Sequence, residues 1–178
     1  MPRRMPRRTF NRREVLALGG AALCGAWLPG RLLGAEESRH TKGLEDALAE
    51  SDLIYVTPLH ADGRESSCQA EVWFTADDGD AYVVTASDAW RARAVRNGLS
   101  RARVWVGDVG VWTRSDGAYR ELPGMEARAS LITDAEEHDR VLDLFGGKYR
   151  LEWAIWGPRF RNGLADGSRV MVRYQPAA

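Results

Sequence analysis

The chain has 178 residues with 25 basic and 25 acidic side chains, and 44% of its residues are hydrophobic. This length suits one domain preceded by a targeting segment, and the composition excludes a chain that is disordered throughout. The charge is unevenly divided: residues 1–35 hold seven arginines and one acid, which leaves 18 basic and 24 acidic side chains in residues 36–178. Such an acidic domain is a poor candidate for binding nucleic acid, because affinity for a polyanion depends on concentrated Lys and Arg.

Residues 1–35 have the three parts of an export signal, namely a basic start, an apolar run and a region of small residues. The apolar run, Val15 to Leu28, is about fourteen residues long and thus shorter than the roughly 20 that span a bilayer. The stretch Asn11-Arg12-Arg13-Glu14-Val15-Leu16 is similar to a twin-arginine signal. We therefore predict a twin-arginine signal peptide over 1–35, with the domain exported to the periplasm or another extracytoplasmic space. An ordinary secretory signal with additional arginines is the alternative.

The cysteines agree with export in the folded state. If cleavage falls near Ala35, the mature chain keeps Cys68 as its single cysteine and forms no internal disulfide. The twin-arginine export machinery moves folded domains, often with a cofactor already bound. No His or Asp stands at a recognisable spacing from Cys68, so we expect an inert thiol rather than a nucleophile.

The first half of the domain is predicted to alternate strands with tight turns. Residues 36–50 form a polar tether and a short amphipathic helix, Leu44–Ala49. Strands are expected over Leu53–Leu59, Ala70–Thr75 and Ala81–Thr85, with turns at Asp62-Gly63 and Asp77–Asp80.

A basic helix follows the third of these strands. It carries Arg91, Arg93 and Arg96, and we expect Asp88 to cap its first turn and Gly98 to end it. The arginines are equally compatible with a solvated helix face, so the phosphate site that they suggest remains one of two interpretations.

The second half of the domain follows the same pattern. Strands are expected over Arg101–Val106, continuing through Gly107–Trp112 by a bulge, then over Met125–Ile132 and Ser168–Tyr174. Thr133 or Asp134 is expected to cap a helix that ends at Phe145, and Lys148–Phe160 to form a helix or helical hairpin that stops at Pro158. This order predicts a mainly β, α+β fold, an antiparallel barrel with helices at its ends.

These features resemble the split β-barrel of the pyridoxamine 5'-phosphate oxidase-like superfamily, whose members depend on FMN or a deazaflavin. The resemblance spans roughly Leu53 to Pro176, within a split β-barrel domain predicted over 51–178. It depends on the strand that ends in Val72-Trp73-Phe74, the Asp-Gly turn into the next strand, the basic helix, and a late Lys148-Tyr149 helix followed by a terminal strand. It implies a homodimer with the flavin or deazaflavin ring between subunits, along Val72, Trp73 and Phe74.

By the same resemblance, Thr85, Ser87 and Arg91, with Arg96, are the candidate ligands of the cofactor phosphate. Hydroxyl groups, backbone N–H groups and a bidentate guanidinium are donors that suit phosphate. The cofactor would transfer hydride to an unidentified small-molecule substrate, so no catalytic dyad is required of the protein. The tryptophans fit a core or dimer interface as well as a stacking site.

A second interpretation is a cofactor-free split-barrel binding module outside the cytoplasm. It is motivated by Glu71 near the expected ring and by the absence of Pro from the strand before Trp73. No His, Cys and acidic residues have the spacing of a metal site, and the sequence has neither a Gly-rich phosphate loop nor a nucleophile elbow.

Overall fold

The computed structural model describes residues 43–177 of the chain. The predicted signal peptide and residues 36–42 of the predicted tether lie outside these residues. Among the helices between residues 43 and 177, none has the length and apolar character needed to cross a membrane.

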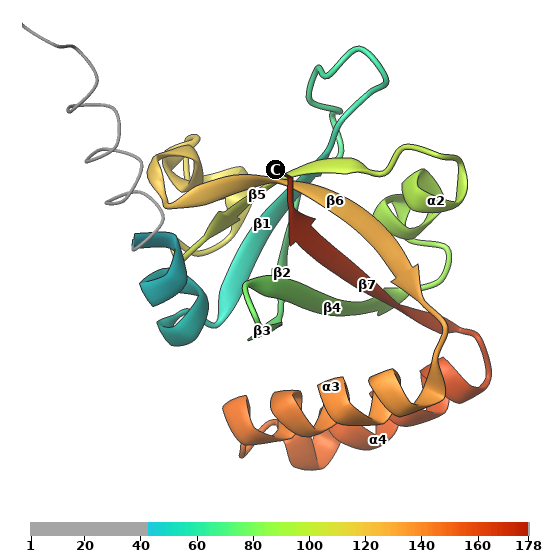
Figure 1. The fold of residues 1–178 in the computed structure, drawn as a ribbon. Coiled ribbons are helices and arrows are strands. Elements are labelled where there is room, and N and C mark those ends of the chain that lie inside the picture. Colours follow the sequence, from blue (N-terminus) through green and yellow to red (C-terminus); the bar gives the residue numbers. More distant parts are fainter. Residues whose placement is uncertain (1–42, 178) are drawn as a thin grey trace, which may run out of the picture.

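Seven antiparallel strands form one sheet that closes nearly into a barrel, as predicted (Figure 1). The strands lie in the order β2-β1-β5-β6-β7-β4-β3. They are β1 (Leu53–Pro58), β2 (Ala70–Trp73), β3 (Thr75–Asp77), β4 (Asp80–Ala86), β5 (Arg101–Val106), β6 (Gly124–Ile132) and β7 (Arg169–Pro176).

The two edge strands, β2 and β3, are consecutive in the chain and separated by Phe74 alone. The prediction of one strand over Ala70–Thr75 is therefore wrong, because β2 pairs with β1 whereas β3 pairs with β4. At the break, the Tyr149 hydroxyl accepts the Phe74 N–H at 3.1 Å and lies 2.8 Å from the Phe74 carbonyl and 2.7 Å from that of Asp52, to which it donates. This side chain takes the place of a neighbouring strand at the seam of the barrel.

The turn between β3 and β4 forms as predicted. Asp78 and Gly79 have φ of 50° and 81°, between the paired residues Asp77 and Asp80. Two central residues with positive φ match the twist of the flanking strands, and Gly adopts this conformation without a steric penalty.

Apolar side chains fill the barrel, and helices close its two ends. Ala81 and Val83 of β4 point into this interior, and Leu48 from the helix at 43–50 packs against the same cluster. Val95 of α2 (Trp90–Arg96) packs against it as well. The predicted helix near residues 44–49 and the helices at the barrel ends are thus confirmed.

Helix α2 ends as predicted but begins differently. Gly98 has φ of 82°, and the N–H groups of Gly98 and Leu99 donate to Val95 and Ala94 at 3.0 and 2.9 Å. The expected cap at Asp88 is wrong, because Ala89 occupies the N-cap position and no side chain accepts from the first turn.

Two longer helices cover the outer side of the barrel below β4 and β7 (Figure 1). Helix α3 (Ala135–Lys148) is capped by Asp134, whose carboxylate accepts the Glu137 N–H at 2.8 Å, as predicted. Its buried face consists of Val141, Leu142 and Phe145. The helix extends three residues beyond Phe145, and Lys148 therefore belongs to α3.

Helix α4 (Trp153–Ala165) continues through Pro158, so the predicted stop is wrong. Pro158 removes the N–H that would bond the carbonyl of Ala154. Both residues are exposed, so the lost hydrogen bond lies on the solvent side of the helix and away from the core.

The segment after β5 is a loop with two short 3-10 helices, η1 (Trp112–Arg114) and η2 (Ala118–Glu121), rather than the predicted bulged strand. The Tyr55 hydroxyl holds this loop by accepting the Val109 N–H at 2.9 Å and donating to the Gly110 carbonyl at 2.7 Å. These bonds occupy backbone groups that a strand would use for pairing.

Candidate functional site

An apolar cavity of about 180 Å³ lies on the outer side of the barrel, between β2, β4 and α4. Its lining residues are Val72, Trp73, Val84, Trp156, Phe160 and Arg169. The Trp73 ring stacks on Tyr149 at 4.6 Å between centroids and 10° between planes, and it meets the Trp156 ring edge-on at 6.0 Å. The cavity therefore has flat aromatic walls that are fixed by their own packing.

The structure separates the three residues expected along a cofactor ring. Val72 and Trp73 line the cavity. Phe74 does not: its side chain is fully buried in the barrel interior. Both backbone groups of Phe74 are bonded to the Tyr149 hydroxyl, so the residue serves the seam of the barrel.

Thr85, the predicted phosphate ligand on β4, lies on the other side of its strand from the cavity. Side chains alternate along a strand, so Thr85 points inward with Ala81 and Val83 whereas Val84 lines the cavity. Thr85 is 2% exposed, and its Oγ1 has no hydrogen-bond partner among the described residues. A ligand in the cavity does not meet this hydroxyl.

The predicted basic residues gather where β4 ends. The Arg96 guanidinium donates to the Ser87 carbonyl. The Nε of Arg91 is buried and, within residues 43–177, lacks a hydrogen-bond partner. Ser87 and Arg96 thus lie together at the end of β4.

Arg169 is the cationic residue that the sequence analysis missed. It pairs with Ala86 across the β4–β7 ladder and lines the aromatic cavity, and its guanidinium lies 5.3 Å from the centroid of Phe160. The sequence around Arg169 does not identify it as a site residue, because it lies far along the chain from α2, the helix that carries the predicted phosphate ligands. Only the pairing of β7 with β4 brings it to this end of the sheet.

Two residues considered in the sequence analysis, Glu71 and Cys68, do not line the cavity. Glu71 accepts the Trp112 N–H at 3.3 Å and so points toward the loop before η1. Cys68 is a free, half-buried cysteine, and its burial raises the pKa of the thiol, although the nearby Arg91 and Arg93 lower it. A raised pKa keeps the thiol protonated at neutral pH and favours an inert role.

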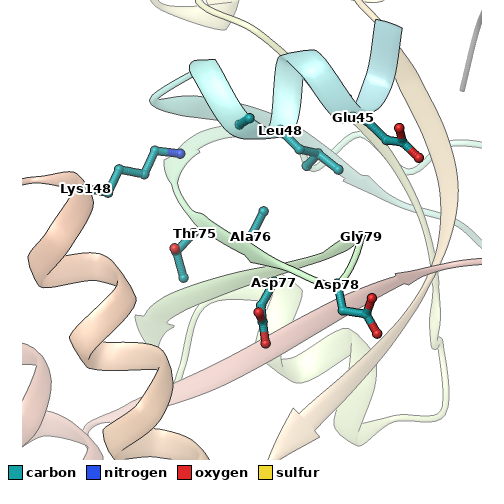
Figure 2. A pocket seen from close by; sticks show the side chains of 9 residues that line it. Glu45, Leu48, Thr75, Ala76, Asp77, Asp78, Gly79 and Lys148 are labelled. Carbon is teal, nitrogen blue, oxygen red and sulfur yellow. The ribbon is translucent and has the colours of Figure 1, made fainter. Parts of the chain in front are cut away.

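A larger cavity, of about 430 Å³, lies at the opposite end of β4, between the helix at 43–50, the β3–β4 turn and the end of α3 (Figure 2). Lys148 extends into it from α3, and Glu45, Asp77 and Asp78 lie along its rim. Among residues 43–177 no group of three His, Cys, Asp or Glu side chains is arranged to hold a metal ion.

The sequence matches no protein-family model and no curated protein. Solved structures share the fold. A provisionally named pyridoxamine 5'-phosphate oxidase of Listeria innocua has a TM-score of 0.51 at 14% identity, over 79% of this chain and 94% of the other. A conserved hypothetical protein of Mycobacterium tuberculosis has a TM-score of 0.52 at 19% identity, over 75% and 78% of the two chains.

A third similar structure is a provisionally named 5-nitroimidazole antibiotic resistance protein of Bacteroides thetaiotaomicron, with a TM-score of 0.52 at 11% identity over 77% of this chain and 80% of the other. Structures similar to this chain thus include split-barrel proteins of the pyridoxamine 5'-phosphate oxidase-like kind. At identities below 20% the similarity concerns the fold, and it agrees with the fold expected from the sequence.

Proposed function

We propose that this protein is an exported split-barrel oxidoreductase that binds a flavin or deazaflavin and acts on a small substrate. The cofactor ring lies in the aromatic cavity, against Trp73 and Trp156. Its phosphate lies toward the end of β4, near Ser87, Arg91, Arg96 and Arg169. Hydride transfer is the chemistry that such a cofactor supplies when bound, and the chain supplies the binding surface.

The observation that carries this proposal is the combination of flat aromatic walls with Arg169 in one cavity. A flavin ring requires an apolar slot, and its phosphate requires a cation and N–H donors within reach. The residues present fit both requirements. Glu71, which argued against a cofactor, faces the loop before η1 instead of the cavity.

The size of the cavity supports a homodimer. At about 180 Å³ it is smaller than the roughly 300–1,000 Å³ typical of small-molecule sites. A second copy of the chain would enlarge the site by covering its open side. The proposed enzyme is therefore complete only as a dimer.

A cofactor-free binding module remains the second candidate, and the orientation of Thr85 favours it. The predicted phosphate hydroxyl is buried inside the barrel, on the opposite side of β4 from the cavity. A barrel that had lost its cofactor would need no hydroxyl at the cavity.

The test is the absorption spectrum of full-length protein purified from a host that makes both flavins and deazaflavins, followed by titration with FMN and a deazaflavin. We expect bound cofactor, and a loss of affinity of about tenfold or more in Arg169→Ala, because one charge-assisted pair is removed. Arg114→Ala, at an exposed arginine that ends η1, is the matched control and should bind as the parent does. A colourless protein that binds neither cofactor supports the binding module instead.

Export is tested separately, on the arginine pair of the proposed signal. The double substitution Arg12→Lys with Arg13→Lys should leave the precursor in the cytoplasm, as judged by fractionation. Unchanged export would eliminate the twin-arginine route and leave the cofactor proposal intact.

A further inference from the structure

Lys148 is placed unusually for a lysine. Its Nζ is buried and has no hydrogen-bond partner among residues 43–177, although an ammonium group has three protons to donate. The nitrogen lies 3.6 Å from the centroid of the Phe74 ring. Its side chain also lines the 430 Å³ cavity, where Figure 2 shows it extending toward the space between the helix at 43–50 and β3.

The choice of lysine at this position is informative. The chain has 25 basic residues, of which only Lys42 and Lys148 are lysines and the rest are arginines. An arginine keeps its charge at any accessible pH, whereas a buried lysine loses a proton readily and then acts as a nucleophile or base. The one lysine in the described residues thus stands beside a cavity, with its Nζ packed against the Phe74 ring and not hydrogen-bonded to another described residue.

The surroundings make the neutral amine of Lys148 more abundant than that of an exposed lysine. Burial lowers the pKa of Lys148 to about 8, while the nearby Asp52 carboxylate opposes the shift. The Tyr149 hydroxyl is engaged with Phe74 and the Asp52 carbonyl, and its own pKa is raised by burial, so it remains protonated.

We propose that Lys148 is the reactive amine of a second site, where it forms an imine with a small, positively charged aldehyde or ketone. The neutral amine adds to the carbonyl carbon and gives a carbinolamine. Loss of water from the carbinolamine leaves a carbon–nitrogen double bond, with no change in oxidation state. Hydrolysis reverses the reaction.

The charge of the rim selects the ligand. Asp77 is paired with Arg140, but Glu45 and Asp78 have no ion pair within residues 43–177. Figure 2 shows Glu45 and Asp78 at the other end of the cavity from Lys148, with the Asp78 carboxylate directed away from the helix at 43–50. A carbonyl compound with a cationic group therefore gains an attraction that an anionic one lacks.

The test is reductive trapping on full-length protein. Betaine aldehyde, propanal and glyoxylate serve as cationic, neutral and anionic probes, each with cyanoborohydride, and peptide mass spectrometry measures modification at Lys148 and Lys42. At pH 7 a group with a pKa of about 8 has a neutral fraction roughly 300-fold above that of an ordinary lysine. We expect Lys148 to react about tenfold or more faster than Lys42 and than free N-acetyl-lysine, fastest with betaine aldehyde.

Variants separate the site from general reactivity. Lys148→Arg should abolish the fast modification, and Lys42→Arg should leave it unchanged. Glu45→Gln with Asp78→Asn should remove the preference for betaine aldehyde over glyoxylate but retain the reaction with propanal. The pH dependence of the trapping rate is measured in the same variant. Asp52, Asp77 and Tyr149 are unchanged there, so any difference from the parent comes from Glu45 and Asp78. If Lys148 in the unaltered protein reacts no faster than Lys42, the proposal is overturned.

Discussion

At the scale of single residues, the Tyr149 hydroxyl holds the seam where the barrel closes. It bonds the Phe74 N–H and reaches the carbonyls of Phe74 and Asp52, which belong to segments far from it in the chain. The Tyr149 ring also stacks on Trp73, so the same side chain joins the seam to the wall of the aromatic cavity.

We expect Tyr149→Phe to lower the free energy of unfolding by about 1–3 kcal/mol, because buried backbone groups lose their partner. Urea unfolding measures this loss. Tyr82→Phe is the matched control, since its hydroxyl lies 3.5 Å from the Glu137 carboxylate and bonds it weakly. That variant should lose less than about 0.5 kcal/mol. Equal losses in the two variants would contradict the role assigned to Tyr149.

Lys148 should make stability depend on pH. Its pKa is about 8 in the folded chain and near 10.5 when unfolded, so between these values the unfolded chain binds more protons. Stability therefore rises with pH across this window, and the cost of burying the charge is present below it. The measured quantity is the free energy of unfolding of the parent minus that of Lys148→Met. After allowance for solvent screening, we expect this difference to increase by about 1–2 kcal/mol from pH 7 to 10. A difference that does not vary with pH would show an unshifted lysine.

At the scale of elements, two aspartates looked alike in the sequence and behave differently in the fold. Asp88 and Asp134 both precede helices, yet only Asp134 caps one. The difference comes from the backbone: the helix after Asp134 begins at the next residue, whereas Ala89 stands between Asp88 and α2. Helix boundaries one residue apart are beyond what local sequence decides.

We expect Asp134→Ala to destabilise the protein by about 1 kcal/mol, because the Glu137 N–H loses its acceptor. Asp88→Ala should change stability by less than about 0.3 kcal/mol, since it makes no cap. Thermal and urea unfolding of the two variants, compared side by side, check this difference. A loss in Asp88→Ala as large as that in Asp134→Ala would mean that Asp88 stabilises the fold in another way.

The elements that the sequence predicted were those with a local cause. The alternation of polar and apolar residues predicted β5 and most of β6, and Gly98 predicted the end of α2. The divided strand around Phe74 and the passage of α4 through Pro158 depend on partners elsewhere, namely the Tyr149 hydroxyl and the solvent on the exposed side of α4. No local pattern contains that information.

At the scale of the whole molecule, the same distinction holds for the site. The antiparallel barrel follows from strand periodicity and turns, but the aromatic cavity joins Trp73 to Trp156 and Arg169, which the fold alone brings together. Only the resemblance to the split-barrel superfamily implies that Thr85 binds the phosphate. Which side of β4 its hydroxyl occupies depends on how the sheet curls.

Two large apolar side chains are exposed near the aromatic cavity. Leu151 is 86% exposed and Ile155 60% exposed, and Ile155 precedes Trp156 of the cavity wall on α4. Large apolar side chains this exposed are typical of surfaces that a partner covers. If the chain dimerises through this corner of α3 and α4, the second copy would also cover the open side of the cavity.

We therefore expect the full-length chain to be a dimer by light scattering, and Leu151→Glu with Ile155→Glu to be a monomer, because burying two carboxylates opposes association. Val111→Glu is the control: this residue is 44% exposed but lies in the loop before η1, on another part of the barrel, and the variant should remain a dimer. The monomeric variant should also bind FMN about tenfold or more weakly, since its cavity alone is too small for the cofactor. A monomeric variant with unchanged FMN affinity would show that the cofactor site does not depend on the dimer. A double variant that stays dimeric would show that Leu151 and Ile155 are not in the dimer interface.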